Sequence, residues 1–463
     1  MKKLLVTLSL AIILPITFLF SACDPTSILN QNTPEGEKVQ LSGVQSLNPT
    51  PSEPVAPERP STNLPPIVEP TYDVDFYQIY KSAYDNGEFT GSYLEFIEKY
   101  FGVSTKESSS VQYATNIGLL SAVSVYSAFT TTFEDPLGNT QTQNYSSAGA
   151  GVIYTLNKEE GSAYIITNYH VVYDINSDTE DKISDDINVY LYGGEYAELA
   201  IPATYVGGSM VYDIAVLEVR ESLTLVSSHA RSADFANSDE TPVGSTAIAI
   251  GNPEANGIAA TQGIVCVDSE DIIMTTVDKV SEVQMRVMRI DTAVNSGNSG
   301  GGLYNCEGKL IGIVNAKKNN TEIENISYAI PSNIAKNVAD NIIDNCANSE
   351  NKQVLKCMLG VGITVASSSS VYDTETKTTR IKEEVLISTI TVGSLADQVL
   401  STGMIVTAIS KGETRVEVDR TYKLVDFMLT GRVGDTITIE VVDNGEEKSF
   451  DITLTDSSIT KIA

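Results

Sequence analysis

A serine in a glycine-rich turn is the feature of this chain best suited to chemistry. Ser299 lies in the run NSGNSGGG (295–302), between two apolar segments of the kind that form strands. Glycines permit strained backbone dihedrals, so several N–H groups can converge on one point. Such groups can stabilise an oxyanion beside a serine hydroxyl, as acyl transfer requires. A Gly/Ser surface loop has the same composition, so the turn becomes informative only if the serine has catalytic partners.

A serine hydroxyl is a weak nucleophile at neutral pH and needs a positioned base. The chain has two histidines. His170 ends the β-branched and aromatic run 163–172, which predicts a buried strand that carries the imidazole at its end. His229 lies in the polar stretch 227–232 and is predicted to be a solvated surface residue. His170 is therefore the candidate general base.

The base needs a carboxylate that fixes its tautomer. Asp213 directly precedes the apolar run 214–219, and a buried acid at that edge needs a hydrogen-bonding partner. A turn carboxylate before a strand is the alternative interpretation of Asp213. Asp174 and Asp291 are rivals, but Asp174 is close in sequence to the histidine and Asp291 directly precedes the serine turn.

The segments around these residues resemble the HtrA/Deg family of trypsin-like serine proteases. The resemblance follows the order histidine, aspartate, serine and is carried by residues 149–153, 167–172, 213–217, 249–253, 261–265, 290–301 and 327–332. It implies a mainly β protein whose protease domain, residues 105–345, is a double β-barrel with its site in the cleft between the barrels. Many short strands bounded by Gly, Asn and Asp turns agree with that fold.

By this resemblance Ser299 is the nucleophile, His170 the general base and Asp213 its orienting partner. The oxyanion hole falls on Gly297, Asn298 and Ser299, with the N–H groups of Gly297 and Ser299 as donors. No cofactor is implied.

Two positions near the serine bear on regulation and specificity. Ser296 stands where the family usually has proline, and loss of that fixed φ predicts a more mobile turn. Ala293 lies six positions before the serine, where enzymes that cleave after basic residues have aspartate. The resemblance therefore implies a pocket for small or medium aliphatic residues.

The C-terminal residues 346–463 alternate apolar and polar residues in short runs, as strands do, with one helix predicted near 422–429. They resemble a single α+β PDZ domain of the permuted kind that follows HtrA proteases. Leu359, Gly360 and Val361 match its peptide-binding loop, which captures a C-terminal carboxylate beside a strand that takes a peptide by β-augmentation. The segment 394–400, expected to be helical, departs from the family pattern. A half-buried sheet with one helix and no ligand is the alternative.

The N-terminus has the layout of a signal peptide, with Lys2 and Lys3 before the apolar run 4–20. Cys23 follows two small residues and resembles a bacterial lipoprotein box. Residues 1–22 are then removed, and lipid on Cys23 anchors the chain to the outer face of the cell membrane, outside the cytoplasm. An uncleaved anchor helix is the alternative.

Two segments separate this terminus from the protease domain. Residues 23–70 are rich in Pro, Ser, Thr and Asn, which predicts a disordered tether. Residues 71–104 hold two runs with helical spacing of apolar residues, and predict a helical hairpin that serves either as a contact or as a spacer.

Composition restricts the partners. With 60 acidic and 30 basic residues the net charge is −30, which argues against binding nucleic acid. Cys266, Cys306, Cys346 and Cys357 allow three disulfide pairings, and a Cys346–Cys357 bridge is one hypothesis. The two histidines and the scattered cysteines lack the spacing of metal ligands, so no metal site is predicted.

Two functions remain open from the sequence. The first is an ATP-independent serine endopeptidase of protein quality control, which cleaves misfolded proteins and binds unfolded or C-terminal peptide segments. The second is a non-catalytic binding protein on the same scaffold. The family resemblance also implies a homotrimer or larger assembly through the region near residues 113–129.

Overall fold

The computed structural model describes residues 76–91, 96, 99–100, 109–194, 199–315, 326–347, 349 and 351–462. The predicted signal peptide, the tether, Cys23 and most of the second helix of the hairpin lie outside these residues. Among the described residues no helix is both long and apolar enough to cross a membrane.

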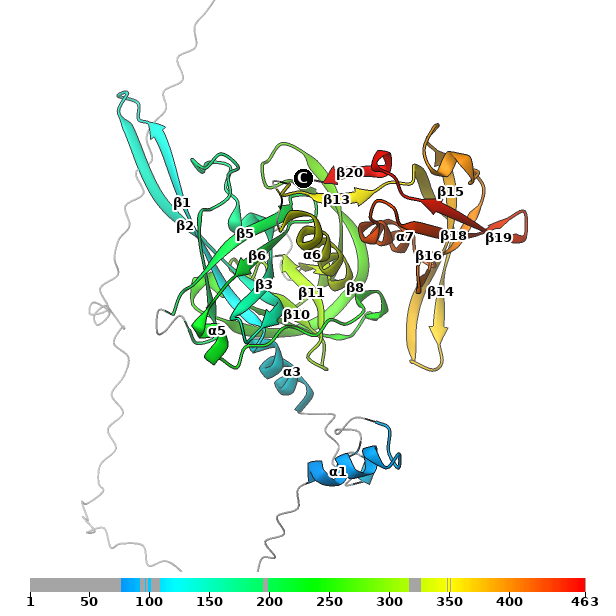
Figure 1. Ribbon diagram of the computed structural model, residues 1–463, viewed down its shortest axis with the longest axis horizontal. Helices are drawn as coiled ribbons and strands as arrows, with labels where there is room; N and C mark the ends of the chain where they lie inside the picture. Colours follow the sequence, from blue (N-terminus) through cyan, green and yellow to red (C-terminus); the bar gives the residue numbers. More distant parts are fainter. Residues whose placement is uncertain are drawn as a thin grey trace, which may run out of the picture. The chain divides into compact units, whose positions relative to one another are not determined.

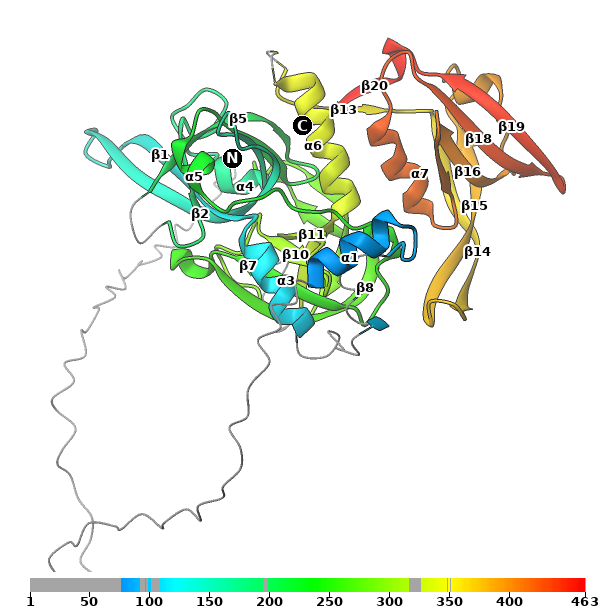
Figure 2. The same ribbon diagram turned by 60° about the horizontal axis from the view of Figure 1, so that its bottom comes forward.

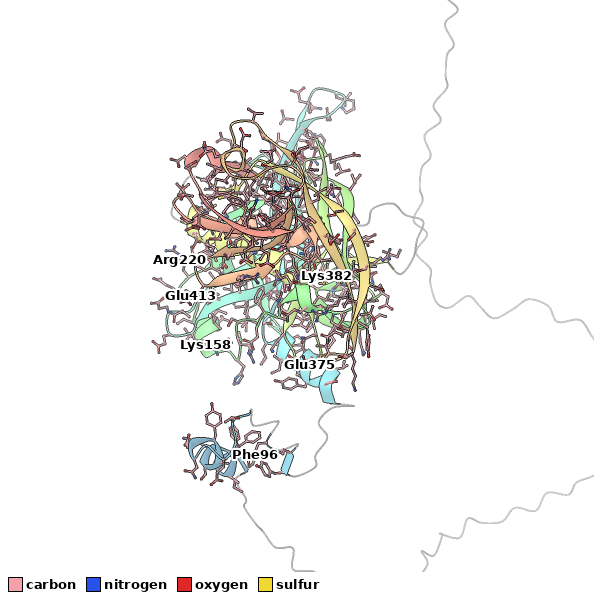
Figure 3. The ribbon with its side chains drawn as sticks, turned by 90° about the vertical axis from the view of Figure 1, so that its right-hand side faces the viewer. Phe96, Lys158, Arg220, Glu375, Lys382 and Glu413 are labelled. Carbon is pink, nitrogen blue, oxygen red and sulfur yellow. The ribbon has the colours of Figure 1, made fainter. Side chains whose placement is uncertain are left out.

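The first helix of the predicted hairpin is present as α1 (Phe76–Asp85), and it ends just before Gly87, whose φ is +73°. The Tyr80 ring of this helix packs edge-on against Phe89 and Phe96, with centroids 6.3 and 5.7 Å away. Phe96, labelled in Figure 3, is 4% exposed. An aromatic cluster therefore supports this short segment.

Helix α3 (Ser109–Leu119) precedes the first of two closed barrels. That barrel has the strand order β1-β2-β3-β6-β5-β4. Its strands are β1 (Ala122–Glu134), β2 (Thr140–Asn157), β3 (Ser162–Thr167), β4 (Asp186–Leu191), β5 (Ile201–Ser209) and β6 (Ile214–Val219). The outer ends of β1 and β2 pair as a ribbon that extends beyond the barrel (Figure 1).

The second barrel has the strand order β10-β11-β12-β9-β8-β7. Its strands are β7 (Thr246–Gly251), β8 (Ala259–Thr275), β9 (Glu282–Ile290), β10 (Gly302–Tyr304), β11 (Leu310–Asn315) and β12 (Ser327–Pro331). Three short helices lie between β6 and β8: α5 (Leu223–Ser227), η2 (Ser238–Glu240) and η3 (Pro253–Ala255). The predicted double β-barrel is thus confirmed, with buried aliphatic residues filling each barrel.

Helix α6 (Ser332–Cys346) leads from the second barrel to a C-terminal β-rich domain. This domain has a sheet in the order β14-β15-β16-β18-β19, with β17 paired to β16, and a separate pair β13–β20. The strands are β13 (Val354–Cys357), β14 (Val361–Asp373), β15 (Thr378–Ile390), β16 (Ile405–Lys411), β17 (Thr414–Glu417), β18 (Thr436–Asp443), β19 (Glu446–Thr453) and β20 (Ile459–Ile462).

The predicted helix of the C-terminal domain is present as α7 (Thr421–Phe427), continued by η5 (Met428–Thr430), and it lies along the sheet (Figure 2). The short helix η6 (Asp456–Ser458) precedes β20. In the segment 394–400 only η4 (Ala396–Gln398) forms, so the helix expected there is reduced to one turn.

The hypothesised bridge between Cys346 and Cys357 is wrong. Both are free thiols, and each is fully buried in a different hydrophobic cluster. Burial raises the pKa of each thiol, which disfavours the thiolate needed for disulfide exchange.

A buried ionic cluster joins the second barrel to α7. Arg286 of β9 is 6% exposed at its side chain and pairs with Asp426 of α7 and with Asp239, the latter at 2.8 Å. Its guanidinium lies 3.4 Å from the centroid of the Tyr422 ring. Burial raises the pKa of Asp426 to about 6, because the loss of hydration outweighs the attraction of Arg286.

Replacing Asp426 by asparagine should change how stability depends on pH. An unfolded aspartate titrates near about 3.9. Between about pH 4 and pH 6 the folded wild type therefore keeps a proton that the unfolded chain has lost, and its unfolding free energy falls as pH rises. Over this pH range we expect the unfolding free energy of wild type, measured by urea unfolding, to fall about 1–3 kcal/mol more than that of Asp426→Asn.

The matched control is Asp451→Asn, which changes an exposed aspartate of β19. The unfolding free energies of this control and of wild type should change in parallel between pH 4 and pH 6. A difference between wild type and Asp426→Asn that is flat across pH 4–7 would contradict the raised pKa.

Candidate active site

His170 lies just beyond the end of a buried strand. The strand β3 stops at Thr167, and His170 is the second residue of the short helix α4 (Tyr169–Val172), so the predicted strand through 172 was too long. The chain turns because the carbonyl of Asp213 accepts hydrogen bonds from Asn168 Nδ2 (2.7 Å) and from the Tyr169 N–H (3.2 Å). A tertiary contact therefore overrides the local strand preference.

His170 and Asp213 make two hydrogen bonds to each other. His170 Nδ1 lies 2.7 Å from Asp213 Oδ2, and the His170 backbone N–H donates to Oδ1 at 3.0 Å. Because an ionised carboxylate only accepts, this contact places the ring proton on Nδ1 and leaves Nε2 free to accept one. The Asp213 side chain is 3% exposed and that of His170 is 22% exposed, so the base can be reached while its partner stays buried.

Two asparagines that the sequence did not single out hold Asp213. Asn315, at the end of β11, donates from Nδ2 to Asp213 Oδ2 at 3.0 Å, and Asn168 donates to the Asp213 carbonyl. Both asparagines are nearly or fully buried. Their only signal in the sequence is an amide at the end of an apolar run, which does not identify the partner.

The rival acids and the second histidine are placed elsewhere. Asp174 accepts from the Asn176 backbone N–H at 2.8 Å, and Asp291 accepts from the Ile264 N–H at 2.6 Å. His229 is exposed, as predicted. The structure thus pairs Asp213, and neither rival, with His170.

The serine turn lies between β9 and β10 and packs on the first barrel. The carbonyl of Ser299 accepts from the Ala150 N–H at 2.8 Å, which joins the turn to β2. Gly300 sits against Thr167 and Asn168, the residues that lead to His170. Ser299 is 5% exposed. The nucleophile candidate is therefore held beside the segment that carries the base.

Glycine is required at two positions of this turn. Gly297 has φ +92°, and a Cβ there would lie 2.0 Å from the Asn252 carbonyl oxygen. Gly300 has φ +83°, and a Cβ there would lie 2.3 Å from the Ala150 carbonyl oxygen. Any side chain at either position would displace backbone, so the turn can keep this shape only with glycine.

The backbone N–H groups of the turn divide into used and unused donors. The Asn298 N–H donates to the Asn295 carbonyl at 3.0 Å, and the Gly300 N–H donates to Val314 at 3.0 Å. The N–H groups of Gly297 and Ser299 donate no hydrogen bond to any residue that the structure describes. The turn itself uses the Asn298 N–H, so the two N–H groups expected to donate in an oxyanion hole, those of Gly297 and Ser299, are the ones left unused, and the oxyanion hole stays a prediction.

The two positions linked to regulation and specificity have simple surroundings. The carbonyl of Ser296 accepts from the Glu254 N–H at 2.7 Å, and greater mobility of the turn stays a prediction. Ala293 is exposed, and its carbonyl accepts from Thr261 Oγ1 at 2.8 Å. The aliphatic specificity also stays a prediction. Within the described part of the chain no cluster of His, Cys, Asp and Glu could hold a metal ion.

Comparisons with known proteins agree with this geometry. Residues 149–313 match the family model described as "Trypsin-like peptidase domain". The chain is 30% identical over 316 residues to the serine protease Do-like HtrA of Bacillus subtilis (strain 168), covering 67% of this chain and 64% of that protein. It is 37% identical over 196 residues to the protein of that name from Lactococcus lactis subsp. cremoris, which covers 41% of this chain and 43% of that protein.

Residues 149–313 are a trypsin-like peptidase domain, and the chain is similar to HtrA serine proteases. A solved structure described as "HtrA-type protease AlgW with decapeptide" covers 74% of this chain and 97% of its own, at 22% identity and a TM-score of 0.46. The chain spans less than two thirds of the length of the two HtrA proteins from Bacillus and Lactococcus.

A second candidate site lies in the β-rich domain that follows the peptidase domain. It is an apolar groove of about 110 Å³ beside β14 and α7. The predicted loop Leu359, Gly360 and Val361 forms part of it. The other lining residues are Lys356, Cys357, Met358, Ile363, Leu424, Val425 and Met428.

This groove has the features that an extended peptide needs. Strand β14 is at the edge of the sheet, so one side of its backbone is open to a further strand. The N–H groups of Leu359 and Gly360 donate no hydrogen bond within the described residues. Gly360 has φ +82°, which suits a loop that directs successive N–H groups to one point.

Substituting Gly297 should test the oxyanion hole of the peptidase domain. In Gly297→Ala the new methyl group must displace the Asn252 carbonyl, which moves the N–H groups of the turn. We expect kcat to fall about 10²–10³-fold with a much smaller change in KM, as when an oxyanion donor is lost. Steady-state hydrolysis of a peptide ester measures both.

The control is Gly138→Ala, in the exposed connection between β1 and β2, where a Cβ meets nothing within 4 Å although φ is also positive at +79°. It carries similar backbone strain far from the oxyanion hole and should keep wild-type kcat. If Gly297→Ala kept wild-type kcat, these N–H groups would not be the oxyanion donors.

Proposed function

We propose that the protein is an ATP-independent serine endopeptidase that cleaves misfolded or exposed proteins. The observation that carries the proposal is the pairing of His170 with Asp213 beside the glycine-bounded turn of Ser299. A base with a fixed tautomer and two unused N–H donors next to one serine are the parts that acyl transfer needs.

In the proposed reaction the Ser299 hydroxyl attacks the scissile carbonyl and gives its proton to His170 Nε2. Asp213 stays ionised and stabilises the imidazolium through the 2.7 Å contact with Nδ1. The carbonyl oxygen becomes an oxyanion and accepts hydrogen bonds from the Gly297 and Ser299 N–H groups. His170 then protonates the leaving amine, and water repeats the sequence to release the acyl group.

We also propose that the C-terminal domain is a PDZ domain that binds unfolded or C-terminal peptide segments. Its apolar groove, its edge strand and the unused N–H groups of Leu359 and Gly360 support this role. We propose a part in protein quality control from the resemblance to HtrA serine proteases.

The sequence supports a proposed location and assembly. Lipid on Cys23 would anchor the protein to the outer face of a bacterial cell membrane, with the peptidase domain outside the cytoplasm. A homotrimer or larger assembly is proposed from the family resemblance alone. The net charge of −30 disfavours nucleic acid as a partner.

Ser299→Ala should abolish cleavage of casein while leaving the fold intact, because it removes one buried oxygen and no backbone contact. The measurement is the release of casein fragments by equal amounts of wild type and variant, with melting temperatures as the control for folding. Equal cleavage by both would exclude Ser299 as the nucleophile. Cleavage by neither, with peptide ligands added, would favour a non-catalytic binding protein.

Val425→Lys should block the groove. Val425 is 42% exposed on α7, so the substitution places a long charged chain in an apolar site without disturbing the core. We expect a fluorescent peptide with an apolar C-terminal residue to bind wild type, and to bind the variant at least about ten-fold more weakly. Val433→Lys, at a similarly exposed valine outside the groove, is the control. Equal binding by wild type and by Val425→Lys would contradict the site.

A further inference from the structure

The turn that carries Asp213 is strained. It connects the end of β5 at Ser209 to the start of β6 at Ile214, and Asp213 has φ +47°. A left-handed backbone is unfavourable for aspartate and persists only where the surroundings hold it. The orientation of this carboxylate toward His170 therefore depends on what contacts the turn.

The peptidase domain holds one end of the turn. Asn168 and Tyr169 bind the carbonyl of Asp213, and Asn315 binds its carboxylate. All of these contacts are made to Asp213 itself, so they do not hold the preceding residues of the turn, 210–212.

The segment 352–356, which leads from α6 into the C-terminal domain, contacts the other end. The Gly208 N–H donates to the Lys352 carbonyl at 2.9 Å, and Gly208 forms a parallel bridge with Gln353. Lys356 Nζ donates to the Tyr212 hydroxyl at 2.8 Å and lies 5.6 Å from the centre of its ring. Tyr212 is covalently next to Asp213, so this hydrogen bond acts one residue from the triad acid.

Both members of this hydrogen bond are partly withdrawn from water. Burial lowers the pKa of Lys356 and raises that of Tyr212. The nearby Asp426 of α7 opposes the first shift and adds to the second. A partly buried ammonium that lost its acceptor would be costly, so the contact should persist in the folded protein.

We propose that Lys356 is a positioning residue for the triad. By holding the Tyr212 hydroxyl, Lys356 fixes the turn 210–213 and keeps Asp213 directed at His170. The inference rests on the proposed peptidase function and extends it. The C-terminal domain then supplies a residue that supports the chemistry, in addition to any peptide that it binds.

The test is a double-mutant cycle on kcat. Lys356→Met keeps an unbranched side chain out to the ε-carbon and removes the ammonium, while Tyr212→Phe removes only the hydroxyl. We expect each variant to lower kcat about three- to ten-fold with KM nearly constant, and the double variant to be no slower than the slower single variant. Lys356→Arg should recover part of the loss, because it keeps a donor at that position.

The control is Lys382→Met, at an exposed lysine of β15 that is labelled in Figure 3. Lys382 pairs with Glu417 at 3.1 Å. The substitution should leave kcat unchanged. A purely structural role for Lys356 predicts a lower melting temperature with unchanged kcat for the folded fraction. That result would overturn the proposal. So would a double variant whose fold-loss in kcat equals the product of the fold-losses of the two single variants.

A second measurement is independent of proteolysis. The chain has two histidines, so protein labelled with ¹⁵N-histidine gives one set of ring signals for His170 and one for the exposed His229. In Lys356→Met the His170 Nδ1 signal should shift while that of His229 stays in place. An unmoved His170 signal would overturn the proposed role of Lys356. Failure of the proposed peptidase function would be seen in a different experiment, as casein cleavage that does not depend on Ser299.

Discussion

The hydrogen bonds between His170 and Asp213 are the interaction on which the site depends. An ionised carboxylate at 3% exposure is costly unless its oxygens are satisfied, and here three donors from two residues satisfy them. Asp213 accepts these bonds with a left-handed backbone at φ +47°, and Lys356 donates a hydrogen bond to the neighbouring Tyr212. The barrels position that carboxylate and bring the serine turn against the strand that leads to the base.

Buried polar and charged side chains contribute to the contacts between the two folded domains. Arg286 is buried between Asp239 and Asp426 and stacks on Tyr422, while Lys356 reaches Tyr212. Buried charges of this kind add little net stability, but they penalise every arrangement in which one partner is missing. They therefore favour one geometry of the interface, and that geometry includes both the helix beside the groove and the turn that holds the triad acid.

Much of the site could be predicted from the sequence because its chemistry uses rare residues. With two histidines, one in an apolar run and one in a polar loop, the base was nearly determined. Gly297 and Gly300 indicated a turn that only glycine can form, and both have a positive φ in the structure. The strand expected through His170 was too long, since no local pattern reveals that the Asp213 carbonyl captures Asn168 and Tyr169.

From the sequence by itself, alternation and glycine placement indicated strand-rich domains and a glycine-bounded serine turn, because these are local properties, and the resemblance to HtrA/Deg proteases supplied the double barrel, the order of the triad and the loop 359–361. Tertiary structure alone decided how the Asp213 carboxylate and its backbone meet His170, and that Asn315 contacts Asp213 while Lys356 contacts the neighbouring Tyr212. It also kept Cys346 and Cys357 apart as free thiols. These outcomes depend on distances between residues far apart in the chain, and such distances arise only when the two barrels and the C-terminal domain pack together.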